Sequence, residues 1–111
     1  MLAVTREKLL AHLRELSVIV DRFGQRDAFI KDVLGWMVRT EQSLQQIRSP
    51  MSSFIAAERG RILAVGDGLR DPEIPEAGSV RKAERAMAAL AMSRVEASLR
   101  MRVDQIDQQL E

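Results

Sequence analysis

Few residues of this 111-residue chain could do acid–base or metal chemistry. There is no cysteine and only one histidine, His12, so neither a thiolate nucleophile nor the paired Glu-x-x-His motifs of a di-iron bundle can form. No nucleophile pattern accompanies His12, and we predict a structural or surface role for it. The sequence thus predicts no catalytic residue, no metal site and no cofactor, which favours a protein that is not an enzyme.

Four carboxylates gather in the segment 66–78, which is also rich in glycine and proline. They are Asp67, Asp71, Glu73 and Glu76. Their spacing does not match the ligand positions of an EF-hand loop, and Pro72 stiffens the segment. We therefore expect a solvated loop rather than a calcium site.

Three cations, Arg81, Lys82 and Arg85, follow this loop at the expected start of a helix, where phosphate binding is favoured. Glu84 lies among them, no aromatic residue is interleaved, and the formal charge of the chain is only +1. These features disfavour nucleic acid as a partner. A nucleic-acid-associated regulator that uses this basic segment stays the alternative function.

Two aromatic residues, Phe29 and Trp36, lie one heptad apart on an expected helix. An exposed pair of this kind would be an anchor for a partner protein, because large aromatic side chains dominate binding interfaces. The same spacing is typical of core residues. Both interpretations, partner anchor and core, are open from the sequence.

The composition predicts the elements that must position these residues. Apolar residues make up 46% of the chain, charged residues 30% and aromatic residues only 4%, which favours helices over sheets. We expect an all-α fold, an antiparallel helical bundle of about four helices with a long C-terminal helix and coiled-coil-like packing. No apolar run approaches the roughly 20 residues of a membrane-spanning helix, and no secretory signal opens the chain. We expect a cytoplasmic protein with no membrane partner.

Apolar residues recur at alternating steps of four and three from Leu9 onward, which predicts packed helices. Ser49-Pro50 interrupts this pattern and predicts a new helix start, because proline fits the first turn of a helix. The expected helices cover roughly residues 3–23, 27–48, 50–66 and 79–110, with a loop at 66–78. All belong to a single domain, residues 1–111.

The segment 22–29, RFGQRDAF, admits two interpretations. Gly24 suits a left-handed C-terminal cap and Asp27 an N-cap, which predicts a turn. The heptad phase continues across the segment, which would suit one long helix. The helix after Asp27 carries a second apolar stripe that needs an additional neighbour, and this favours the turn.

The last helix has an apolar stripe that continues to its end: Met92, Val95, Leu99, Val103, Ile106 and Leu110. At about 50 Å, this helix should extend beyond its shorter neighbours, so we expect these six residues to mediate self-association. Residues 79–102 carry a net charge of +4 and residues 103–111 a net charge of −3. An antiparallel pair of chains would set opposite charges side by side, which predicts a homodimer or higher homo-oligomer.

Two segments resemble known families. Residues 99–110, LRMRVDQIDQQL, resemble the opening helix of the AroQ-type chorismate mutases, which implies an amphipathic helix. Residues 23–47, with the helices expected after them, look like the small helical export chaperones of flagellar and type III secretion systems, without a diagnostic motif. The second resemblance implies protein binding. The favoured function is a non-catalytic protein–protein interaction module, a small helical adaptor, chaperone or assembly component that self-associates.

Overall fold

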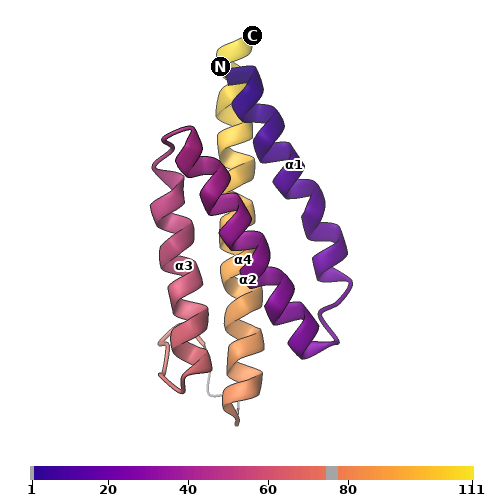
Figure 1. Ribbon diagram of the computed structural model, residues 1–111, viewed down its shortest axis with the longest axis vertical. Helices are drawn as coiled ribbons and strands as arrows, with labels where there is room; N and C mark the ends of the chain where they lie inside the picture. The colour runs from indigo at the N-terminus through magenta and orange to yellow at the C-terminus, as the bar shows by residue number, and fades with distance from the viewer. Residues whose placement is uncertain (1, 75–77) are drawn as a thin grey trace.

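The computed structural model describes residues 2–74 and 78–111, which form four helices and no strand (Figure 1). They are α1 (Leu2–Val20), α2 (Arg26–Gln46), α3 (Met51–Gly66) and α4 (Val80–Leu110). Successive helices run in opposite directions along the long axis. The predicted all-α antiparallel bundle with a long last helix is confirmed.

The long helix α4 is the spine of the bundle. In Figure 1, α3 lies beside the first half of α4, whereas α1 begins beside the C-terminal end of α4 and runs back from it, so that the start of α1 and the end of α4 are neighbours. Helix α2 contacts the other three helices, and α1 and α3 do not contact each other within the described residues. The four helices are therefore staggered along α4 rather than aligned at one level.

This stagger removes the premise on which the expected role of the apolar stripe on α4 rested. Five of its six residues are buried within the single chain: Met92, Val95, Leu99, Val103 and Ile106. Only Leu110, with 52% of its surface exposed, lies open. Helix α1 packs on α4, and Arg6 Nε donates to Asp107 Oδ1 at 2.6 Å near the chain ends. The premise that the stripe lacks a partner within the chain is wrong, because α1 is displaced toward the far end of α4.

The two candidate anchors lie in the core. Phe29 and Trp36 both have 0% of their surface exposed. The indole Nε1 of Trp36 donates to the carbonyl oxygen of His12 at 2.8 Å, which joins α2 to α1. Buried indole N–H groups need such a partner, so Trp36 fixes how these two helices pack. Of the two interpretations that the sequence left open, the structure shows the core one.

The segment 21–25 is a turn, as predicted, and the alternative of one continuous helix is wrong. Helix α1 ends at Val20, three residues earlier than expected, and Gly24 does not adopt the predicted left-handed conformation. Phe23 lies in this turn. Its ring meets the Phe29 ring edge-on with centroids 5.0 Å apart, and the Arg85 guanidinium lies 5.0 Å from its centroid. These ring contacts join the turn to α2 and to the start of α4.

Candidate functional site

Among the residues that the structure describes, none near His12 is a partner suited to catalysis. Its Nδ1 is buried without a hydrogen bond and lies 3.8 Å from Glu15 Oε1. Burial lowers the pKa of His12 below its ordinary value, and the opposing effect of Glu15 is smaller. The ring is therefore neutral near pH 7. Within the described ranges, no three His, Cys, Asp or Glu side chains are grouped so that they could hold a metal ion.

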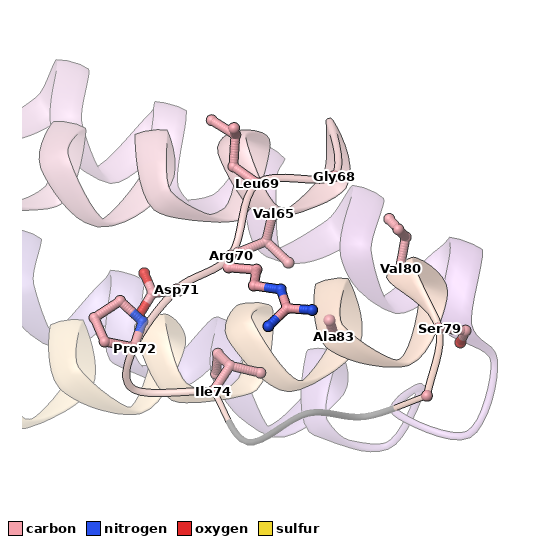
Figure 2. A pocket seen from close by; sticks show the side chains of 11 residues that line it. Val65, Gly68, Leu69, Arg70, Asp71, Pro72, Ile74, Ser79, Val80 and Ala83 are labelled. Carbon is pink, nitrogen blue, oxygen red and sulfur yellow. The ribbon is translucent and has the colours of Figure 1, made fainter.

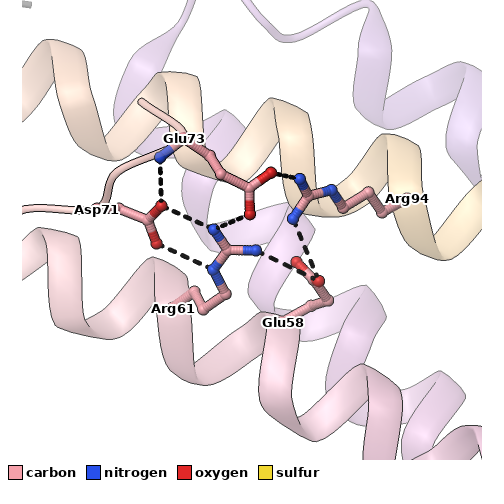
Figure 3. A network of polar contacts seen from close by, with 5 residues as sticks. All are labelled: Glu58, Arg61, Asp71, Glu73 and Arg94. Carbon is pink, nitrogen blue, oxygen red and sulfur yellow. Dashed lines mark hydrogen bonds and ion pairs between the residues drawn. The ribbon is translucent and has the colours of Figure 1, made fainter. Parts of the chain in front are cut away.

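The acidic segment after α3 is tied to the bundle by arginines instead of being solvated throughout. Figure 3 shows Arg61 between two loop carboxylates: its Nε and Nη2 donate to both oxygens of Asp71 at 2.9 and 2.7 Å, and Nη2 also donates to Glu73 at 2.6 Å. Arg94 of α4 pairs with Glu73 from the other side. Two predicted loop residues therefore fasten the loop to α3 and α4. Glu76 lies outside the described residues.

The centre of this cluster is Glu58, which the sequence reasoning missed. Its side chain is 8% exposed, and its Oε1 lies 3.6 Å from both Arg61 Nη1 and Arg94 Nη1. A buried carboxylate requires such pairing, because an isolated buried charge is very costly. The signal was present in the sequence: Glu58 occupies the apolar face of α3, between Ile55 and Ile62.

The hydrogen bonds from Arg61 hold the pKa of Asp71 below its ordinary value.

A cavity of about 600 Å³ lies beside this cluster, between the end of α3 and the start of α4. Figure 2 shows its apolar walls, with the Arg70 side chain extending across the space toward Ala83. Arg70 has an interaction of its own within the protein. Two lining residues, Ile74 and Gly78, flank residues 75–77, which lie outside the described part of the chain. We assign no ligand to this cavity.

The predicted basic cluster at the start of α4 is divided. Ser79 is the N-cap of α4, and its hydroxyl accepts a hydrogen bond from the Lys82 amide at 3.2 Å. Arg81 and Lys82 are exposed. Arg85 instead lies over the ring of Phe23. Two of the three cations, rather than all three, remain on the open surface.

A second hollow, of about 560 Å³, lies between the start of α1, the α2–α3 connection and the far half of α4. We call it the arginine groove. Its apolar lining comprises Leu9, Leu44, Ile47, Pro50, Met51 and Met101. Its polar lining comprises Thr5, Arg48, Ser49, Ser98, Arg102 and Gln105. Neither set contains a carboxylate.

The two arginines of the arginine groove form no ion pair with any described residue. Arg48 has no ion pair with any described residue, and Arg102 contacts only the side-chain oxygen of Gln105, at 3.5 Å. Met101 beside them is 62% exposed. Sequence reasoning missed this site because its walls come from three distant segments, and no spacing rule connects them.

Arg48 also has an unusual backbone. Its φ is +57°, which makes it the only non-glycine residue with positive φ in the described part of the chain. The amides of Arg48 and Ser49 donate to the carbonyls of Gln45 and Leu44 at 3.0 and 2.9 Å. This is a Schellman motif, in which the position of Arg48 is normally glycine. An L-residue there costs roughly 1–2 kcal/mol.

The end of α3 makes the same motif with the usual residue. Gly68 has φ +94°, and the amides of Gly68 and Leu69 donate to the carbonyls of Val65 and Ala64, both at 3.0 Å. The two helix ends therefore share one hydrogen-bond pattern and differ in the residue at the left-handed position.

Comparison of the chain with protein-family models, with curated proteins and with solved structures gives no match. Among the described residues, none of the four helices combines the length and the apolar character required to cross a bilayer.

Proposed function

We propose that this chain is a non-catalytic protein-binding module, used as an adaptor, chaperone or assembly component, and that the arginine groove is its docking site. The observation that carries the proposal is the groove itself, an apolar hollow that retains an exposed methionine and two arginines without ion pairs. Methionine suits such surfaces because its flexible side chain adapts to different partners.

The arrangement of the acidic groups supports a role without catalysis. The carboxylates of Glu58, Asp71 and Glu73 are held by Arg61 and Arg94. A general acid or base needs a group that titrates near the working pH and reaches the substrate. These carboxylates are instead engaged by their arginine partners, so they are suited to holding the loop.

Photo-crosslinking in the cells of origin tests the docking site. A benzoylphenylalanine at Met101 should give a reproducible protein adduct. The matched control is Arg100, which is on the same helix, is exposed and pairs with Glu96 on the solvent face. Adducts that are absent at position 101, or equal at both positions, would contradict the proposal.

Self-association stays a prediction on a different basis, because the folded chain itself buries most of the stripe that was expected to mediate it. A dimer of the folded chain would have to use open side chains such as Met101 and Leu110. Sedimentation velocity at micromolar concentration in low salt measures the state of the chain. If a dimer is present, Met101→Glu and Leu110→Glu show which surface forms it.

Arg81 and Lys82 support the alternative function, a nucleic-acid-associated regulator. Phosphate binding would release counterions, so the affinity for a DNA duplex should fall steeply with salt. A salt-dependent affinity that Arg81→Gln and Lys82→Gln reduce, without an effect of Met101→Glu, would favour this alternative.

A further inference from the structure

We propose that the occupant of the arginine groove is an acidic amphipathic helix of a partner protein, whose carboxylates pair with Arg48 and Arg102 while its apolar side chains cover Ile47, Met51 and Met101. This inference rests on the proposed function and specifies the partner. It combines the charge of the groove, its shape and the backbone at Arg48.

The charge argument comes from the two unpaired arginines. Among the described residues, the lining of the groove has two guanidinium groups and no carboxylate, so its electrostatic potential favours an anion. Elsewhere in the bundle, partly covered arginines such as Arg61, Arg94 and Arg59 each pair with a carboxylate. A carboxylate from a partner would give Arg48 and Arg102 the same type of contact.

The shape argument comes from the α4 wall and the apolar lining. Ser98 and Gln105 both face the groove, so this wall is about two helical turns, or roughly 10 Å, long. Leu9 and Leu44 are buried in the lining, and Met101 rises beside them with 62% of its surface exposed. Two turns of an amphipathic helix present apolar side chains three and four residues apart, which suits a wall of this length.

The apolar lining also distinguishes the class of partner. Single-stranded nucleic acid is normally held by aromatic side chains on which bases stack, and no aromatic residue lines the groove. Leucine, isoleucine and methionine side chains instead match aliphatic side chains. The combination of an aliphatic lining with two cations at the surface therefore favours an acidic amphipathic protein segment.

The backbone of Arg48 gives the third argument. The same motif at the end of α3 has glycine at this position, where no conformational cost arises. At Arg48 the chain keeps a full side chain although the left-handed backbone there is strained. This side chain forms no ion pair with any described residue. Strain of this kind is typical of functional positions. A role in binding explains why a cation is present there.

Fluorescence anisotropy with two synthetic probes tests the inference. The first probe is a labelled amphipathic helix with leucines at i, i+3, i+4 and i+7 and glutamates beside them, and in the second probe each glutamate is replaced by lysine. We expect the full chain to bind the glutamate probe at least tenfold more tightly. Arg48→Gly and Arg102→Gln should each weaken that binding about tenfold, and the control Arg100→Gln should not change it.

The stability of each variant, measured in parallel, separates binding from folding. Arg48→Gly should bind more weakly although it is at least as stable as the unchanged chain, a combination that a loss of folding cannot produce. Equal binding of both probes, or no effect of Arg48→Gly and Arg102→Gln, would overturn the inference. A homodimer that Arg102→Gln dissociates would also overturn it, because the occupant would then be a second copy.

The two proposals fail in distinguishable ways. Crosslinking at Met101 without binding of the glutamate probe would leave the docking site in place and refute its acidic partner. Absence of both would refute the docking site as well.

Discussion

The two connections that flank α3 use arginine in opposite ways. At the α3–α4 connection, Arg61 and Arg94 are bound by three carboxylates, and the helix end has glycine at its left-handed position. At the α2–α3 connection, Arg48 is without an ion pair and itself occupies the left-handed position. The ion pairs at the α3–α4 connection stabilise the fold. The α2–α3 connection retains a cation and a strained backbone, which the fold alone does not require.

The largest difference should come from removing the arginine of each connection. Arg61→Met leaves Asp71 without its bidentate guanidinium partner and removes one of the two arginines that hold Glu73. We expect this change to lower the free energy of unfolding by about 1–3 kcal/mol. The matched change Arg48→Met removes no ion pair and should stay within about 0.5 kcal/mol. Urea unfolding followed by circular dichroism at pH 7 measures both. Equal losses would show that the two arginines contribute alike to the fold.

Exchange at the two left-handed positions should give changes of opposite sign. Arg48→Gly relieves a strained backbone and should raise the free energy of unfolding by about 1 kcal/mol. Gly68→Ala introduces the same strain and should lower it by about 1 kcal/mol. A Cβ at Gly68 would have no atom within 4 Å, so its cost is conformational and not steric. Two changes of the same sign would contradict the view that the helix ends are equivalent.

The smallest effect should be a local opening in acid at one connection only. Arg61 holds the pKa of Asp71 below its ordinary 3.8, so the folded chain keeps this carboxylate charged at a lower pH than the unfolded chain does. Its contribution to stability is therefore present above pH 3.8 and is lost as the pH falls through the lower folded value.

Hydrogen exchange of two amides reports this opening. The Glu73 amide donates to Asp71 Oδ1 at 2.9 Å and should lose protection in acid. The Ser49 amide donates to the Leu44 carbonyl, which does not titrate, and should keep its protection. Protection lost at both amides together would indicate global unfolding instead.

The elements of the fold were largely predictable because their signals are local. Helix α4 begins at Val80, next to the predicted start at residue 79, and the Ser49-Pro50 break lies at the start of α3. The relative position of the helices was not predictable. A heptad pattern shows which face of α1 is buried, but it does not show how far α1 is displaced along α4. That displacement decided whether the stripe around Leu99 was covered.

The candidate site was less accessible than the fold for two physical reasons. The arginine groove joins side chains near Thr5, Arg48 and Met101, which only the tertiary structure brings together. The left-handed backbone at Arg48 has no signal of its own, because glycine or asparagine normally marks that conformation. Glu58 is different: a carboxylate on an apolar helix face is a local signal that predicts a buried ion pair.

The contact between Arg6 and Asp107 joins the first helix of the bundle to the last. The chain enters and leaves at one tip, and the α3–α4 connection lies at the opposite tip (Figure 1). If a larger protein carried this chain between two of its own segments, those segments would begin and end side by side. The bundle would then project from the surface of that protein, with the arginine groove on its side.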